Sequence, residues 1–136
     1  MKLLLFYAHD FHFKTAEKGL PDVPDLDLED GRENAVVIFF HVEEEDQGKR
    51  KKVIQKFVKN AKWLCGKFET RTIVLHSFNH LSASKASPVF SHEILKEVVE
   101  RLKRTEYDVM TTPFGYFNEF TIHVGGESLA KVFKEF

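Results

Sequence analysis

Two short stretches of the chain carry the residues best suited to chemistry. The first, "LHSFNHLS" at residues 75–82, places His76 and His80 in a polar segment that follows a short apolar run. An imidazole titrates near neutral pH, so His80 could serve as a general acid, a general base or a group that orients a substrate. The alternative is a loop histidine that only bonds nearby backbone. The sequence leaves both open.

The second stretch is "TTPFGYFNEFTIHV", residues 111–124. Pro113 fixes the backbone and Gly115 relaxes it two residues later, which predicts a bend. The aromatic side chains that crowd this bend are Phe114, Tyr116 and Phe117. Such a bend is either a sheet corner or the wall of a pocket.

The polar residue Asn118 sits among these aromatics. Strand alternation turns it toward the same face as the apolar Phe120 and Ile122. A buried amide there needs hydrogen-bond partners, which are either neighbouring backbone or groups in a small polar cavity.

Other kinds of chemistry find less support. His76 and His80 are four residues apart, and a zinc site would need His9 with His12, or His92, to complete it. The H-E-x-x-H order is absent and no cysteine pair exists, so we expect no metal. The chain also lacks a G-x-S-x-G elbow, a P-loop and a G-x-G-x-x-G turn, and we expect no cofactor.

The elements that must position these residues follow from hydrophobic periodicity. Strands are predicted over residues 2–9, 11–17, 35–42, 72–75, 108–112 and 116–124, and helices over 49–66, from 88 onward and over 128–136. Residues 35–42, "AVVIFFHV", form a continuous apolar run that predicts a central strand. Residues 19–33 are rich in proline and acids, which predicts an exposed loop. The expected class is α+β, or an irregular α/β, with five to six strands and three helices.

Composition limits the choice of function further. The 136 residues are 43% hydrophobic with 14 Phe, so they predict a single domain, residues 1–136, with a core of its own. The last predicted helix runs to Phe136 without a capping signal, from which we expect an N-terminal module of a longer protein.

Cys65, the only cysteine, falls on the apolar side of a helix, and we expect a cytoplasmic protein with no membrane partner. The net charge of −1 argues against general attraction to nucleic acid.

The motifs together resemble a known family. "HSFNHLSASKASP" and "PFGYFNEFTIHVGGESLAK", with "LLLFYAHDFHF" and "VVIFFHVE" earlier in the chain, resemble the N-terminal editing domain of archaeal threonyl-tRNA synthetases. The resemblance implies a fold like that of the D-aminoacyl-tRNA deacylases, a homodimer, and hydrolysis of serine mis-attached to threonine tRNA. It also implies that the remaining synthetase domains are partners and that the terminal ribose hydroxyl of the tRNA helps to activate water.

The resemblance implies site residues as well. The predicted catalytic residues are His80, Asn118 and Lys131. The predicted substrate-binding residues are Val42, which would meet the terminal adenosine, and Phe78, Asn79, Phe114, Gly115, Tyr116 and Phe117. We therefore expect the loop of His80 and the turn at 113–118 to meet across one small cleft.

Two positions depart from the family pattern. Asn118 stands where the family often has a lysine, and Lys131 stands where it often has a glutamate. An amide cannot replace an ammonium electrostatically, so we hypothesise that Lys131 returns a cation to the site. Two alternatives to an editing esterase follow: a catalytically weak tRNA-binding or dimerisation module, and a D-aminoacyl-tRNA deacylase.

Overall fold

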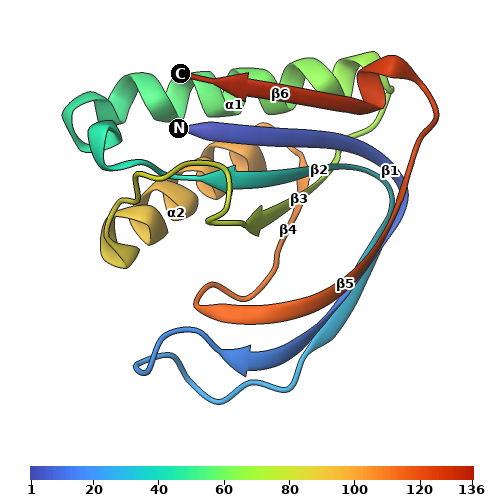
Figure 1. Cartoon of the computed structure of the whole chain (residues 1–136). Helices are drawn as coiled ribbons and strands as arrows, with labels where there is room; N and C mark the ends of the chain where they lie inside the picture. The colour runs from blue at the N-terminus through green and yellow to red at the C-terminus, as the bar shows by residue number, and fades with distance from the viewer.

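One long strand organises the molecule. The computed structural model describes all residues 1–136, and its strand β1 (Lys2–Lys18) pairs antiparallel with three others (Figure 1). Along one edge it pairs with β2 (Glu29–His41). Along the other edge its first half pairs with β6 (Lys131–Glu135) and its second half with β5 (Tyr116–Val124).

The rest of the sheet is parallel. β3 (Thr72–Ser77) pairs with β2, and β4 (Asp108–Thr111) pairs with β3, which gives the order β4-β3-β2-β1-β5 with β6 also on β1. Helix α1 (Arg50–Lys67) connects β2 to β3, and helix α2 (Pro88–Arg104) connects β3 to β4. Two short 3-10 segments, Glu44–Lys49 and Ser128–Ala130, complete the chain.

Both helices cover one face of the sheet. A cluster of 20 buried residues joins that face to α1 and α2, with Phe40, Phe57 and Ile94 among its fully buried members. A second cluster of 8 buried residues, including Phe11, Phe39 and Val74, lies on the face without helices. Cys65 belongs to the first cluster, and burial raises the pKa of its thiol to about 12, so it serves as a core residue.

A bend in β1 moves the side chains of its second half from the helix-side cluster to the second cluster. Leu3 and Leu5 belong to the helix-side cluster, whereas Phe11 and Phe13, also at odd positions, belong to the other one. The change follows a register shift at Ala8/Asp10 in the pairing with β5, as expected of a β-bulge that bends a strand. Figure 1 shows β1, β2 and β5 curving together, which carries β5 toward the ends of β3 and β4.

The predicted α+β class is confirmed, as are the helices at 50–67 and 88–104. The strands predicted over residues 2–9 and 11–17 form one continuous strand, β1, and the other four predicted strands correspond to β2 to β5. Ser87 caps α2 as predicted, accepting a hydrogen bond from the Phe90 backbone at 3.2 Å. The predicted third helix is wrong, because residues 131–135 form strand β6. The predicted exposed loop is shorter than expected, since residues 29–33 belong to β2. Neither helix has the length and apolar character needed to cross a membrane.

Candidate functional site

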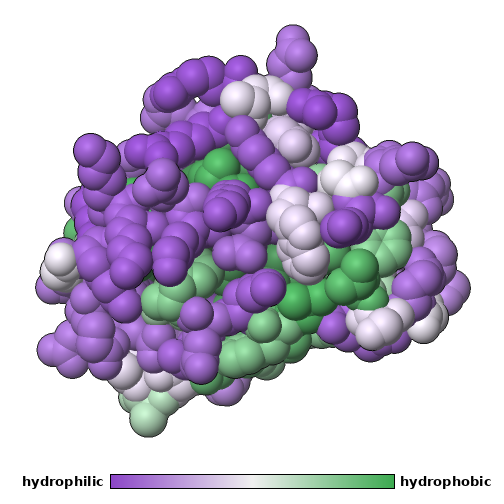
Figure 2. Space-filling model, turned by 90° about the horizontal axis from the view of Figure 1, so that it is seen from above, coloured by the Kyte–Doolittle hydropathy of each residue, from purple (hydrophilic) through white to green (hydrophobic).

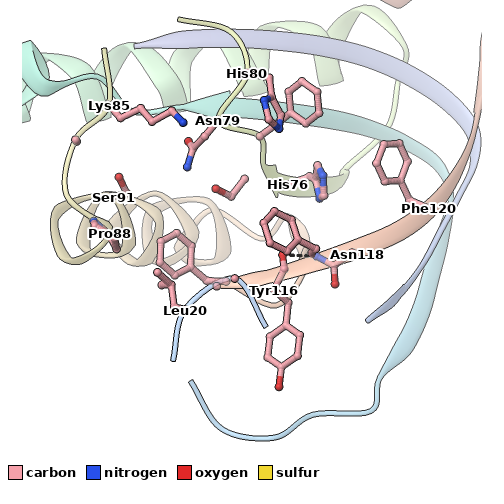
Figure 3. A pocket seen from close by; sticks show the side chains of 17 residues that line it. Leu20, His76, Asn79, His80, Lys85, Pro88, Ser91, Tyr116, Asn118 and Phe120 are labelled. Atoms are coloured by element: carbon pink, nitrogen blue, oxygen red, sulfur yellow. Dashed lines mark hydrogen bonds between the residues drawn. The ribbon is translucent and has the colours of Figure 1, made fainter. Parts of the chain in front are cut away.

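A pocket opens where the parallel strands β3 and β4 end. Parallel neighbours end at the same edge of a sheet, which is where α/β folds place their functional loops. The loop after β3 forms one wall, and the turn between β4 and β5 forms the other (Figure 3). The cavity measures about 390 Å³. That value lies within the range of roughly 300–1,000 Å³ found for small-molecule sites.

Most of the predicted site residues meet here. Of the ten, all line the pocket except Val42 and Lys131. One wall carries Phe78, Asn79 and His80, and the other carries Phe114, Gly115, Tyr116, Phe117 and Asn118. The structure thus places the two predicted segments around one cavity, which is the arrangement that the resemblance requires.

Val42 and Lys131 lie elsewhere. The Val42 side chain is buried in the helix-side core, and only its carbonyl reaches toward the site, accepting a hydrogen bond from the Ala86 backbone at 3.0 Å. Lys131 begins β6, and its Nζ donates to the Gly125 carbonyl at 2.8 Å. Lys131 pairs with Phe6 on β1, whereas Asn118 pairs with Thr15. These partners are nine positions apart on β1, about 30 Å along the strand. The structure does not support a cation returned by Lys131.

His76 forms the inner aromatic end of the pocket. It is 5% exposed and its ring lies 4.9 Å from Phe39 and 5.1 Å from Phe120, centroid to centroid. Burial lowers the pKa of His76 to about 4, so the ring is neutral at pH 7. Its Nδ1 lies 2.9 Å from the Thr112 hydroxyl, which ties the end of β3 to the end of β4.

Asn118 brings an unused acceptor to the same region. Its Nδ2 donates to the Tyr116 carbonyl at 3.3 Å. Its Oδ1 is buried and has no hydrogen-bond partner. A buried polar atom without a partner costs about 1–3 kcal/mol, so such atoms in native proteins call for an explanation. A donor on a bound ligand would satisfy this one.

A buried histidine fixes the loop that carries His80. His41, at the end of β2, is 0% exposed, and its Nδ1 accepts a hydrogen bond from the Leu81 backbone at 3.1 Å. Its Nε2 therefore carries the proton and donates to the Ser84 carbonyl at 2.7 Å. Burial lowers the pKa of His41, which favours this neutral form. Glu43 adds a third attachment by accepting from the Ser82 hydroxyl at 2.7 Å.

The opposite wall is held by a tight turn. Gly115 has a φ of 84°, and its carbonyl accepts from the Gly19 and Leu20 backbones at 2.6 and 3.1 Å. A Cβ at this position would lie 2.6 Å from the Val23 side chain, so the turn requires glycine. The Tyr116 hydroxyl extends the contact by donating to the Pro24 carbonyl at 2.5 Å. The acidic loop is thereby packed against the pocket wall.

Sequence reasoning missed several lining residues. Gly19 and Leu20 belong to a segment that the sequence predicts only as an exposed loop, while Lys85 and Ser91 flank the start of α2. The capping pattern at Ser87-Pro88 predicts the start of α2. A helix start next to a candidate site is the one sequence signal that indicates Lys85 and Ser91 as lining residues. Nothing in the spacing of Lys85 sets it apart from other exposed lysines.

The pocket has an unusual charge balance. Its lining residues include one lysine and two histidines, and none is an aspartate or a glutamate. No group of three or more His, Cys, Asp or Glu side chains in the structure is placed to hold a metal ion. The site therefore offers imidazole, amide, hydroxyl and ammonium groups to a ligand, beside the rings of Phe78, Phe114, Tyr116, Phe117 and Phe120.

The chain is similar to known ligases over its full length. It is 30% identical over 142 residues to a threonine–tRNA ligase of Hyperthermus butylicus, covering 100% of this chain and 23% of the ligase. With the ligase of Staphylothermus marinus the identity is 32% over 138 residues, covering 98% of this chain and 22% of the ligase. The chain thus spans less than a quarter of the length of these curated relatives.

A solved structure shares the fold. The c-Myc DNA Unwinding Element Binding Protein matches with a TM-score of 0.69 over 99% of this chain and 98% of that one. At 12% identity this likeness concerns the fold alone. The model of one sequence family, described as the archaea-specific editing domain of threonyl-tRNA synthetase, matches residues 1–136. Since the match spans the whole chain, the chain belongs to the archaea-specific editing domain family of threonyl-tRNA synthetase.

Proposed function

We propose that this chain hydrolyses the ester joining serine to threonine tRNA. A water oxygen bonds to the ester carbonyl carbon, the bond from that carbon to the terminal ribose oxygen breaks, and the proton lost by the water goes to the ribose oxygen. The products are free serine and uncharged tRNA. The observation that carries the proposal is the single pocket, in a member of an editing family, lined by both the His80 loop and the Phe114–Asn118 turn.

Selection by size explains why such a site is needed. Serine lacks one methyl group of threonine, and one methyl is worth only about 1–3 kcal/mol of discrimination in a binding pocket. A second, hydrolytic site that admits only the smaller residue multiplies the selectivity. The aromatic rings of this pocket are stiff side chains, so they can exclude the extra methyl of threonine.

The lining residues suggest distinct roles in this reaction. His80 lies beside the Phe78 ring, with centroids 5.0 Å apart, where its imidazole can orient the ester or the water. The Oδ1 of Asn118 accepts a hydrogen bond from the serine ammonium, which gives that atom the partner it lacks. No carboxylate lines the pocket to act as a base. The terminal ribose hydroxyl of the tRNA, with His80 beside it, helps to activate the water.

Deacylation assays with three substrates test the proposal. Purified protein is mixed in excess with seryl-tRNA(Thr), threonyl-tRNA(Thr) or a D-aminoacyl-tRNA, and ester loss is followed in a single turnover. Seryl-tRNA should be cleaved at least tenfold faster than threonyl-tRNA, as about 1.4 kcal/mol of size discrimination requires. Preferred cleavage of the D-aminoacyl ester would assign the chain to chirality editing. Binding without cleavage would make it a tRNA-binding module.

A pair of variants connects the activity to the pocket. His80→Gln removes a lining imidazole and should slow seryl-tRNA cleavage at least tenfold. Lys131→Ala changes a residue outside the pocket and should leave the rate within about twofold of the unchanged protein. Equal effects of the two changes would contradict the assignment of the site.

We also propose that two copies of the chain pair through the sheet face without helices. Phe133 on β6 is 50% exposed and lies opposite Leu4 of β1, which in turn lies opposite Phe39. Figure 2, seen from the side on which β6 lies in Figure 1, shows a hydrophobic band between hydrophilic regions. Apolar surface gathered in this way is typical of interaction sites.

A further inference from the structure

Lys85 is the only ammonium side chain in the pocket. It comes from the loop between β3 and α2, and Figure 3 shows its side chain reaching toward Asn79, which belongs to the same loop. No ion pair or side-chain hydrogen bond holds its Nζ; the ion pairs of the molecule all involve other residues. With no carboxylate in the lining, this charge has no counter-ion within the site. Lys85 is exposed and solvated in the empty protein, and in a carboxylate-free pocket its charge favours an anionic over a cationic group on the part of a ligand beside it.

A second feature beside Lys85 points to the same kind of ligand. Ser91 lines the pocket from the first turn of α2; the residue is 8% exposed, and its hydroxyl, which has no partner within the protein, is reachable by solvent and so by a ligand. The first turn of a helix carries a partial positive charge, although here Pro88 has no N–H and the N–H groups of Phe90 and Ser91 both bond to Ser87. Ser87 caps this turn through Phe90, so the start of α2 is rigid. Lys85, Pro88 and Ser91 together form what we call the cationic end of the pocket.

The cationic end lies apart from Asn118, whose unpartnered Oδ1 suits the ammonium group of a bound serine. In Figure 3, Lys85, Pro88 and Ser91 lie on one side of the cavity, and Asn118 and Phe120 lie on the other. A seryl ester carries its positive charge on serine, and the nucleotide carries its negative charge on phosphate. A ligand with both charges is therefore bound in one direction only.

We propose that Lys85 and Ser91 bind the phosphate that links the terminal adenosine of the tRNA to the preceding nucleotide. The inference rests on the proposed function, because it takes the aminoacylated RNA end as the ligand. Lys85 forms a charge-assisted contact with a phosphate oxygen, and the Ser91 hydroxyl donates to another. The contact fixes the direction of the substrate, so that serine lies against Asn118 and away from the ammonium of Lys85.

Two analogues isolate the phosphate contact from hydrolysis. The probes are 3′-deoxy-3′-(L-serylamino)adenosine, whose amide resists cleavage, and the same molecule with a 5′-phosphate. Calorimetry gives Kd for each with the unchanged protein, with Lys85→Met and with Lys103→Met. Lys103 is the matched control, since it is exposed near the far end of the same helix, about 22 Å along the axis from Pro88.

The unchanged protein should bind the phosphorylated analogue about three- to tenfold more tightly than the other one. Lys85→Met should remove this preference and leave Kd for the unphosphorylated analogue unaltered, while Lys103→Met should keep the preference. Lys85→Arg should retain part of it, and Ser91→Ala should reduce it by a smaller factor. The slope of log Kd against log salt should fall by about one when Lys85 is replaced.

The outcomes separate this inference from the proposed function. A preference for phosphate that survives Lys85→Met would overturn the inference, and so would a wild-type protein that shows none. If the protein cleaves seryl-tRNA but binds the two analogues equally well, the phosphate inference is wrong and the proposed function still holds. If the protein prefers the phosphorylated analogue through Lys85 but does not cleave seryl-tRNA, the phosphate site is supported and the proposed hydrolytic function is wrong. If neither analogue binds, both the phosphate inference and the proposed function are contradicted.

Discussion

Asn118 combines a cost to the folded protein with a use in the proposed reaction. Its Oδ1 is buried without a partner, although the pocket beside it is open to a ligand. Functional sites commonly retain groups that are unfavourable in the empty protein, because those groups are satisfied when the ligand binds. A neutral acceptor at this position suits the ammonium group of the proposed serine ligand.

The first prediction concerns Asn118→Ala. Removing the unpartnered acceptor offsets the loss of the long 3.3 Å bond to Tyr116, so the free energy of unfolding should stay the same or rise by up to about 1 kcal/mol. The value of kcat/KM for seryl-tRNA should fall about tenfold or more, as expected for a lost hydrogen bond to a charged group. Urea unfolding and deacylation rates measure the two effects. A less stable protein with full activity would contradict this account.

The second prediction concerns the pH dependence of stability. Burial disfavours the charged ring and lowers the pKa of His76 from its ordinary value of 6.5 to about 4 in the folded protein. A lowered histidine pKa stabilises the fold fully above the unfolded pKa and loses that contribution as pH falls. Between pH 6.5 and 4 the loss from this group approaches about 3 kcal/mol.

His76→Gln removes this titration and can keep a hydrogen bond to Thr112. The variant should show a flatter curve of unfolding free energy against pH between 6.5 and 4. His123→Gln changes an exposed histidine and should follow the unchanged protein. Parallel curves for all three proteins would show that His76 is not protonated on unfolding in this range.

At the scale of elements, the third prediction concerns the Gly115 turn. Gly115→Ala introduces a Cβ 2.6 Å from Val23 at a φ of 84°, so it should lower the free energy of unfolding by about 1–3 kcal/mol. Deacylation should slow as well, since Phe114 and Tyr116 leave their places in the wall. Gly126→Ala, where nothing lies within 4 Å, is the matched control and should have little effect. Adding Val23→Ala should recover the steric part of the loss, and no recovery would rule out the contact.

The fourth prediction concerns the loop after β3. His41→Phe keeps an aromatic ring in the core but removes the acceptor for the Leu81 N–H and the donor to the Ser84 carbonyl. The Leu81 amide should then exchange with solvent faster, by at least tenfold, and seryl-tRNA cleavage should slow. Exchange measured residue by residue distinguishes this from general destabilisation. Unchanged protection at Leu81 would show that His41 does not hold the loop.

The sequence predicts the elements where one period dominates, and fails where two fit. The apolar positions of α1 and α2 repeat only at helical spacing, and both helices were predicted. In "LAKVFKEF", Leu129, Val132, Phe133 and Phe136 fit a helix, while residues 131–135 also alternate between exposed and half-buried positions in β6. The free edge of β1 decides between them, and that edge is a tertiary feature.

The predictions of site residues also succeeded for some residues and failed for others. The His80 loop was predicted as a functional loop because it follows a buried strand, and the resemblance predicted that the aromatic turn would face it; the structure brings the two together because the parallel strands β3 and β4 end at the same edge of the sheet. The resemblance placed Val42 and Lys131 by position in the chain, which does not fix where a side chain points. Lys85 had no distinguishing pattern, because its role depends on the absence of carboxylates around it in three dimensions.

At the scale of the whole molecule, the fifth prediction concerns pairing of the chains. Phe133→Glu places a charge on the edge strand β6 within the proposed interface and should convert a dimer into monomers, as seen by sedimentation velocity. Leu28→Glu is the matched control, since Leu28 is 46% exposed but lies on the acidic loop. A protein that is monomeric before any change, or a Phe133→Glu protein that remains dimeric, would reject the proposed face.

The position of β1 in the sheet also bears on how the chain reaches its native state. During synthesis β1 can pair with β2 early, but its second edge stays unoccupied until residues 116–135 have been synthesised. Pairings between distant parts of a chain form slowly, and a long open strand edge invites aggregation meanwhile. We therefore expect a single slow refolding phase in which protection along both edges of β1 appears together, and soluble yield that improves when translation is slowed by cooling.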